Sequence, residues 1–274
     1  MKKLFTRAIT GIVLVLVMLG AIIASKYTFA ALFLAILIGG LHEFSNLFKE
    51  SEVKPNKILS FSVSILLYGI SFFVAQHMIK PDYFLIVFPA LLVIMGAEMY
   101  KKSEKPLENI ASSIFSIIYL AVPISLTNFL VFSETVNSKA YNPILLIALF
   151  AMIWIYDSGA YLVGVSIGKH RLFERISPKK SWEGAIGGTL IVLTASWLLS
   201  GFIPEIKVEH WIAISILTVI SSTYGDLTES MFKRYFGIKD SGNILPGHGG
   251  ILDRFDSLFF AAPVVVMYLK LFVE

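Results

Sequence analysis

One polar stretch, residues 225–257, holds the residue types that could do chemistry in an otherwise apolar sequence. It reads GDLTESMFKRYFGIKDSGNILPGHGGILDRFDS. Carboxylate oxygens are ligands that Mg²⁺ prefers, and Mg²⁺ together with Lys and Arg side chains binds phosphates. The stretch therefore predicts a site for phosphate chemistry. Its ionisable residues are Asp226, Glu229, Lys233, Arg234, Lys239, Asp240, His248, Asp253, Arg254 and Asp256.

The first part of this stretch has helical spacing. If residues 224–233 end a helix, Asp226, Ser230 and Lys233 follow one another at i, i+4 and i+7, and Arg234 lies beside them. A carboxylate, a hydroxyl and two cations would then share one side of the helix. This combination suits a metal ion bound next to phosphate groups.

The second part begins with a loop. Six glycines and one proline fall within residues 225–257, and residues 241–250, which include Gly249 and Gly250, form a glycine-rich segment whose bare backbone could approach a ligand closely. Asp253 and Asp256 follow at i, i+3, so we expect both carboxylates near the start of the next helix. His248, between glycines, is a weaker candidate, because a solvated loop residue or a helix cap would look the same.

The composition indicates a membrane protein. The 274 residues are 56% hydrophobic and only 15% charged, with a mean hydropathy of +0.77. Apolar runs of about 20 residues are long enough to cross a bilayer. Without cysteine, disulfides and thiolate metal sites are excluded. The net charge of +4 follows the expected topology, so nucleic acid is not an expected partner.

The predicted fold is an all-α polytopic membrane protein with about nine transmembrane helices. A cleaved signal peptide is the alternative for the first apolar run, but it lacks a clear small-residue cleavage site, so we interpret it as a span. The predicted spans are residues 8–25, 27–48, 58–79, 82–99, 109–132, 142–164, 184–203, 210–231 and 256–272.

The positive charges test this arrangement. If the connections alternate between the two sides of the membrane, 18 of the 23 Lys and Arg residues fall on the side of the N-terminus. The positive-inside rule then places the N-terminus in the cytoplasm and the C-terminus outside. We divide the chain into residues 1–140, with about five helices, and a catalytic region, 141–274, with about four helices and cytoplasmic loops 165–183 and 232–255.

Two further segments hold polar candidates. Asp157 lies deep in the sixth span, with Tyr161 one turn later, and an intramembrane carboxylate is functional by default, although a neighbouring helix could also satisfy it. In loop 165–183, Lys179 and Lys180 could form a cationic entrance to the site that binds phosphates at the level of the lipid headgroups. Alternatively, they only reflect the positive-inside rule. We expect residues 177–178, Ser-Pro, to start a turn or a helix, and Ser181 to add a donor at a helix N-terminus.

The remaining ionisable residues of the first five spans have a simpler interpretation. His42, Glu43 and Glu98 lie near the ends of the second and fourth spans. We expect them at the membrane interface, where ionisable residues cost little, with a place in a substrate cavity as the alternative.

Residues 230–256 resemble the signature of the phosphatidate cytidylyltransferases. The matching residues are S-M-F-K-R and, after four residues, K-D-S-G-N-I-L-P-G-H-G-G-I-L-D-R-F-D. The likeness extends to G-D-L-T-E just before them, to D-S-G-A-Y at 157–161 and to S-P-K-K-S-W-E-G at 177–184. The family usually has Thr at the position of Ser181, so the hydroxyl is retained. The N-terminal half matches only in being several spans.

The resemblance implies an activity and a setting. The reaction would convert CTP and phosphatidic acid into CDP-diacylglycerol and pyrophosphate with Mg²⁺, and K⁺ is a candidate second metal. The enzyme would be a homodimer embedded in membrane lipid, with its active site facing the cytoplasm. A compact chain looks bacterial, which would place it in the inner membrane.

The resemblance also implies roles for residues. Asp226 and Asp253 would bind metal with Asp256 close by, and Lys233, Arg234 and Ser230 would meet phosphates. The other expected substrate-binding residues are Lys179, Lys180, Ser181, Lys239, Asp240, His248, Gly249, Gly250, Asp157 and Tyr161.

Two other functions remain open from the residues. A CTP-dependent lipid kinase acting on a polyprenol would use a similar site, but its alcohol acceptor would need a general base, for which Asp157 or His248 are candidates. A cation-coupled transporter would explain the intramembrane Asp157 and the many spans. However, the ionisable residues cluster on one side of the membrane, and the sequence shows no inverted repeat.

Overall fold

The computed structural model describes residues 2–136, 140–242, 244 and 249–274, with side chains from residue 10 onward. Its elements are almost entirely helical, which confirms the predicted all-α class. They are α1 (Lys2–Ala24), α2 (Lys26–Leu47), α3 (Lys57–Ala75), η1 (Pro81–Ile86), α4 (Val87–Glu98), α5 (Pro106–Ser116), the π-helical turn η2 (Ile117–Ala121), α6 (Val122–Val131), α7 (Ile144–Ile167), β1 (Arg171–Phe173), β2 (Ser177–Ser181), α8 (Trp182–Ser200), α9 (Val208–Tyr235) and α10 (Leu252–Phe272).

Within the described residues, seven helical segments are long and apolar enough to cross a membrane. They confirm a multi-pass membrane protein. They are Lys26–Leu47, Lys57–Ala75, Pro81–Glu98, Pro106–Val131, Ile144–Ile167, Trp182–Ser200 and Leu252–Phe272. The other two predicted spans are also helical, but α1 offers only the shorter apolar segment Thr10–Ala24, and α9 ends in a charged turn. The count of nine and the side on which each terminus lies stay predictions.

The chain forms two compact units. Unit 1 comprises residues 1–132 and 240–254, and unit 2 comprises residues 133–239 and 255–274. The division passes through the first turn of α10, so that Asp253 belongs to unit 1 and Asp256 to unit 2. Each unit is described below by itself.

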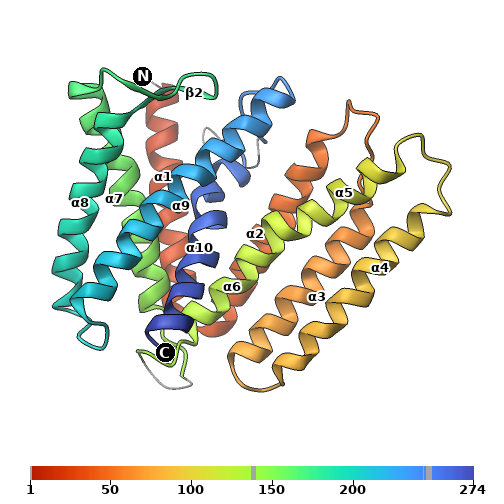
Figure 1. Ribbon diagram of the computed structural model, residues 1–274, viewed down its shortest axis with the longest axis horizontal. Coiled ribbons are helices and arrows are strands. Elements are labelled where there is room, and N and C mark those ends of the chain that lie inside the picture. Colours follow the sequence, from red (N-terminus) through yellow and green to blue (C-terminus); the bar gives the residue numbers. More distant parts are fainter. Residues whose placement is uncertain (1, 137–139, 243, 245–248) are drawn as a thin grey trace. The chain divides into compact units, whose positions relative to one another are not determined.

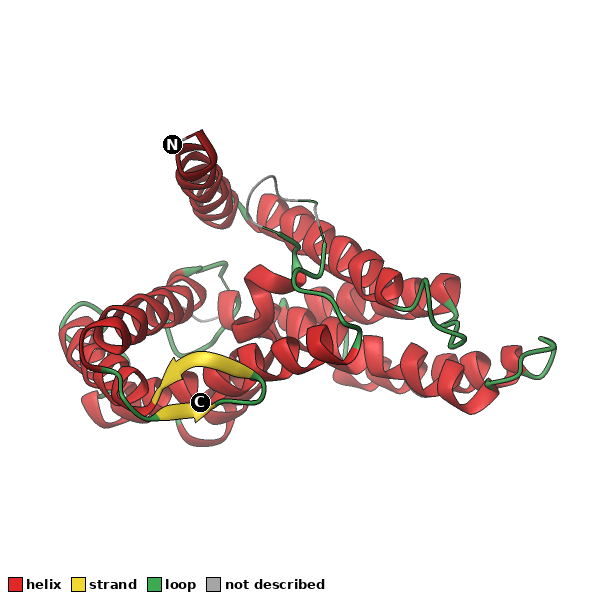
Figure 2. Ribbon diagram, turned by 90° about the horizontal axis from the view of Figure 1, so that it is seen from above, coloured by secondary structure: helices red, strands yellow, loops and turns green. Residues whose placement is uncertain are grey.

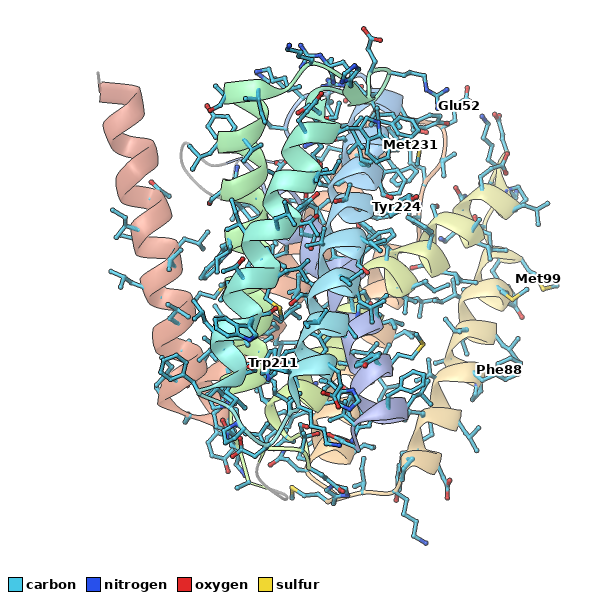
Figure 3. The ribbon with its side chains drawn as sticks, turned by 60° about the vertical axis from the view of Figure 1, so that its left-hand side comes forward. Glu52, Phe88, Met99, Trp211, Tyr224 and Met231 are labelled. Carbon is cyan, nitrogen blue, oxygen red and sulfur yellow. The ribbon has the colours of Figure 1, made fainter. Side chains whose placement is uncertain are left out.

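In unit 1, α3 is the central helix, because it packs against α2, α4 and α6 (Figure 1). Asn109, on α5, connects the end of α4 to the segment before α3. Its amide donates to Glu98 Oε1 at 2.6 Å and accepts from the backbone N–H of Lys54 at 2.6 Å. The outer side of α4 is apolar and exposed. Phe88 and Met99 project away from it (Figure 3), with exposed fractions of 66% and 85%. Such a surface is expected to face lipid chains, which are as apolar as the side chains themselves.

In unit 2, α7 and α8 pack along their whole length because glycines let the two backbones approach (Figure 1). A Cβ atom at Gly184 would lie 2.6 Å from the carbonyl oxygen of Ala160, and one at Gly187 would lie 2.6 Å from the Val163 side chain. Helix α9 packs against both α7 and α8. These three helices form the frame of unit 2.

The connection between α7 and α8 is a two-stranded antiparallel hairpin (Figure 2). Arg171 pairs with Ser181 and Phe173 pairs with Ser177, so the prediction of a turn or helix starting at Ser177 was wrong. A two-stranded ribbon leaves one edge of each strand unpaired, which lets Pro178 occupy β2 although it lacks a backbone N–H. The hairpin leads directly into α8, where Ser181 Oγ accepts the backbone N–H of Gly184 at 3.1 Å.

Candidate functional site

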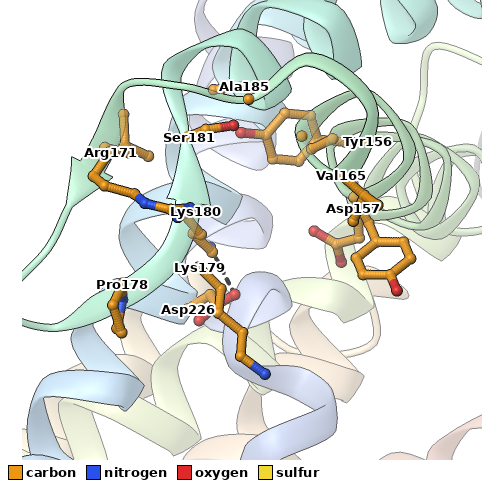
Figure 4. A pocket seen from close by; sticks show the side chains of 15 residues that line it. Tyr156, Asp157, Val165, Arg171, Pro178, Lys179, Lys180, Ser181, Ala185 and Asp226 are labelled. Carbon is orange, nitrogen blue, oxygen red and sulfur yellow. Dashed lines mark ion pairs between the residues drawn. The ribbon is translucent and has the colours of Figure 1, made fainter.

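Unit 2 contains a cavity of about 620 Å³ between α7, the hairpin and the start of α8 (Figure 4). We call it the unit 2 cavity. Acidic groups reach it from helices and basic groups reach it from the hairpin. The side chains that line it include Asp157, Tyr161, Arg171, Lys179, Lys180, Ser181 and Asp226. The structure thus brings together six of the predicted site residues and adds Arg171.

An ion pair joins the two kinds of charge. Lys180 Nζ lies 2.6 Å from Asp226 Oδ2, and the two side chains are 26% and 33% exposed (Figure 4). Ser230 Oγ donates to Asp226 Oδ1 at 3.2 Å from one turn further along α9. The predicted helix over 224–233 is confirmed, and with it the shared face of Asp226 and Ser230. Both oxygens of Asp226 are therefore engaged by residues that were predicted to meet phosphates.

Two more carboxylates lie near this pair. The carboxyl of Asp256 interacts electrostatically with those of Asp226 and Asp157, and Lys180 interacts with all three. Helices α9 and α10 meet here without an intervening side chain, because a Cβ atom at Gly225 would overlap with the backbone of Asp256. Three carboxyl groups of unit 2 therefore lie close to one another, and one of them is ion-paired with Lys180.

The cluster of carboxyl groups raises the question of whether this site fits a metal ion. Like charges held close together in a partly buried site repel one another, and a divalent cation relieves that repulsion. In the part of the chain that the structure describes, no three Asp, Glu or His side chains form a complete metal site. The donors of unit 2 nevertheless fit Mg²⁺ in kind, because they are carboxylate oxygens.

The neighbouring polar residues have distinct positions. Lys179 and Tyr161 line the cavity and are exposed, whereas Ser181 is buried and its hydroxyl oxygen already caps α8. Tyr156 Oη and Thr223 Oγ1 lie 2.6 Å apart and connect α7 to α9 beside the carboxylates. Arg171 was missed in the sequence, since only its pairing with Ser181 in the hairpin places it at the cavity.

The cations at the end of α9 lie elsewhere in unit 2. Lys233 forms an ion pair with the buried Glu229, one turn earlier in the helix, and Arg234 and Lys239 are exposed. None of these three cations is among the described residues that line the unit 2 cavity. The i, i+4 spacing of Glu229 and Lys233 is the signal that could have predicted their pairing from sequence.

The other predicted residues belong to unit 1. Asp253 Oδ2 accepts the backbone N–H and the hydroxyl of Ser241, at 3.0 and 2.9 Å, and the N–H of Gly250 at 2.8 Å. This carboxylate therefore draws both ends of the glycine-rich segment toward the start of α10. Gly249 has φ of +81°, a conformation that favours glycine. Asp240 is exposed, and His248 lies outside the described residues.

Comparison with known proteins finds similar sequences. A model described as the cytidylyltransferase family matches residues 5–272. The phosphatidate cytidylyltransferase of Staphylococcus aureus (strain COL) is 38% identical over 175 residues, which cover 63% of this chain and 64% of that protein. That of Bacillus subtilis (strain 168) is 34% identical over 272 residues, 97% of each chain, and that of Haemophilus influenzae is 46% identical over 124 residues, 43% of each. The matched region thus spans less than two thirds of the Staphylococcus protein and nearly all of the Bacillus protein.

Proposed function

The chain belongs to the cytidylyltransferase family, and we propose that it transfers the cytidylyl group of CTP to phosphatidate, giving CDP-diacylglycerol and pyrophosphate. The observation that carries this proposal is the unit 2 cavity, in which hairpin cations face carboxylates from membrane-spanning helices. Both substrates are polyanions. A site that holds them together needs cations for the phosphates and carboxylates for a bridging metal ion.

The reaction needs little from the protein in the way of proton transfer. An ionised oxygen of the phosphatidate monoester attacks the α-phosphorus of CTP, a new phosphorus–oxygen bond forms, and the bond to the β-phosphate oxygen breaks. Pyrophosphate leaves with the bonding electrons. No general base is required, because the attacking oxygen is already deprotonated near neutral pH. The protein instead aligns the two anions and offsets their repulsion.

The geometry of unit 2 suggests how the work is divided. Lys179, Lys180 and Arg171 lie on the hairpin and would bind the lipid phosphate, while its acyl chains stay in the membrane. Asp226 and Asp256, with Asp157 near, would hold Mg²⁺, which supplies charge neutralisation for the leaving pyrophosphate when bound. Asp157 needs no role as a base in this scheme.

The residues outside the cavity keep the roles that the resemblance implies. Lys233, Arg234 and Lys239 would offset the charge of the triphosphate. Asp253 is the metal-binding residue that the resemblance implies in unit 1, with K⁺ as the candidate second ion. A homodimer in the bacterial inner membrane, with this site open to the cytoplasm, completes the proposal.

Separately labelled CTP tests the proposal. Purified protein in detergent is incubated with phosphatidic acid, Mg²⁺ and CTP labelled at either the α or the γ position. We expect the α label in a lipid product and release of pyrophosphate. The γ label in lipid would instead indicate a kinase, and ion flux in proteoliposomes without CTP turnover would indicate a transporter. Asp226→Asn should lose most of this activity. Asp82→Asn is the matched control, because Asp82 is an exposed carboxylate in unit 1.

A further inference from the structure

Glu43 is a buried carboxylate at one end of α2, only 2% exposed, and it contacts the segment that leads into α10. Its Oε2 accepts the backbone N–H of Leu252, the first residue of α10, at 3.0 Å. The backbone N–H of Ile251 also interacts with this carboxylate. The side chain therefore caps a helix from a position more than 200 residues earlier, and a negative charge there is favoured by the helix dipole.

Two glycines, Gly242 and Gly250, lie close to the same carboxylate. A Cβ atom at Gly242 would overlap with the Glu43 carboxyl group, and one at Gly250 would lie 2.5 Å from Oε2. Both glycines are thus required where the backbone passes over Glu43. Gly242 needs no unusual backbone angle, because only Gly237 and Gly249 among the described glycines have positive φ. At Gly242 the requirement is one of space.

Glu43 and Asp253 hold this segment in complementary ways. Asp253, in the first turn of α10, binds Ser241 and Gly250, and Glu43, on α2, binds the next two residues, Ile251 and Leu252. Together the two carboxylates fix where α10 begins and how the backbone at Gly249 and Gly250 is presented. Asp253, Gly249 and Gly250 are among the residues of unit 1 that the signature assigns to substrate or metal.

We infer that Glu43 is a positioning residue for cytidylyl transfer: it fixes the backbone at Gly242, at Gly250 and at the start of α10 without touching substrate. The inference rests on the proposed function, since it gives the segment a part in the reaction. It also explains glycines of the signature by a residue that lies far outside it. The alternative is that Glu43 is a polar residue at a membrane interface, with no effect beyond stability.

Three variants separate these possibilities. Glu43→Ala removes the cap and should lower kcat by about tenfold or more, because small displacements of groups that position substrate slow a reaction. Glu43→Gln keeps an acceptor for Leu252 and should recover most of that loss. Glu98→Ala is the matched control, because Glu98 is also buried in unit 1 (3% exposed) but binds Asn109 and Lys101 instead. It should leave kcat near the wild-type value even if it lowers the melting temperature.

A double-mutant cycle tests the contact itself. Gly242→Ala should lower kcat strongly in the wild-type protein, because its Cβ meets the fixed Glu43 carboxyl group. In the Glu43→Ala background that space is empty, so adding Gly242→Ala should cost much less. Equal effects of Gly242→Ala in both backgrounds would overturn the inference. An interface residue with a purely structural role predicts such additivity.

Hydrogen exchange keeps this test independent of the assigned reaction. In the intact protein in detergent, Glu43→Ala should speed amide exchange at Ile251 and Leu252 by about tenfold, and Glu98→Ala should not. Unchanged exchange in Glu43→Ala would overturn the positioning contact. Faster exchange with normal kcat would overturn its role in the reaction. Failure of wild-type protein to transfer the α label from CTP would refute the proposed function instead.

Discussion

Replacing Lys180 with Met gives the sharpest test of the charge arrangement in unit 2. The substitution keeps the length of the side chain and removes its ammonium group. Without substrates, that group is the ion-pair partner of Asp226, at 2.6 Å, while the carboxylates of Asp157 and Asp256 lie near enough to repel Asp226. Lys180 therefore competes with any cation that binds there. We expect Lys180→Met to bind a divalent metal more tightly and yet to turn over more slowly.

The size of the effect follows from the geometry. Two unit charges 4 Å apart attract by about 4 kcal/mol at an effective dielectric constant of about 20. Fully exposed pairs retain about 1 kcal/mol or less, and this pair is only a quarter to a third exposed. A net value of about 1.4 kcal/mol corresponds to a tenfold gain in metal affinity. Loss of a cation that is proposed to bind the lipid phosphate should lower kcat/KM on the order of 100-fold.

Metal binding is measured without substrates, so the result does not depend on turnover. Mn²⁺ serves as the probe, titrated into purified protein in detergent and followed by electron paramagnetic resonance. Lys179→Met is the matched control: Lys179 lines the same cavity on the hairpin, and the ion pair to Asp226 comes from Lys180. Asp226→Asn should weaken Mn²⁺ binding and abolish most turnover. Unchanged or weaker binding in Lys180→Met would refute the idea that Lys180 substitutes for the metal.

Two further predictions follow from the packing of unit 2. Gly225→Ala should abolish turnover and lower the melting temperature, because the added Cβ overlaps with the backbone of Asp256, whereas Gly20→Ala, with open space around it, should do neither; normal activity in Gly225→Ala would contradict this close approach of α9 and α10. Burial raises the pKa of the Glu274 carboxyl. The hydrogen bonds from Lys270, Ser133 and Thr135 together outweigh burial and hold that pKa below its usual 4.5. Glu274→Gln should therefore lower the melting temperature by about 2–4 °C at pH 7, a difference that shrinks as the pH falls through the folded pKa; a difference that grows on acidification would contradict the assignment.

Local sequence patterns predicted most of the helices. Apolar runs of membrane-spanning length coincide with helices from α1 to α10, since a chain in lipid must satisfy its backbone hydrogen bonds internally. The i, i+4 relation of Asp226 and Ser230 is also local, and the structure shows the expected hydrogen bond. Asp253 and Asp256 both fall in the opening turns of α10, which starts at Leu252, a few residues earlier than predicted.

These local patterns could not predict contacts between segments that are distant in the sequence. The ion pair of Lys180 with Asp226 depends on the hairpin, whose strands are short, polar and interrupted by Pro178, so that neither alternation nor β-branched residues mark them. Glu43 is a similar case. Its position at the end of an apolar run suggested an interfacial charge, and only the tertiary structure shows that it caps α10.

The placement of opposite charges on different elements has a physical logic in a membrane. Asp157, Asp226 and Asp256 lie on helices, whose backbones are rigid because every hydrogen bond is internal, and close carboxylates must be held rigidly if they are not to move apart. Lys179 and Lys180 lie on a two-stranded hairpin, which is marginal by itself and can adjust to its ligand. In the proposed reaction, cations on the hairpin would follow the lipid phosphate, and Mg²⁺ would need oxygens held in a nearly fixed geometry. Stiffening the hairpin without changing its charges should therefore slow lipid entry and leave Mn²⁺ affinity unchanged.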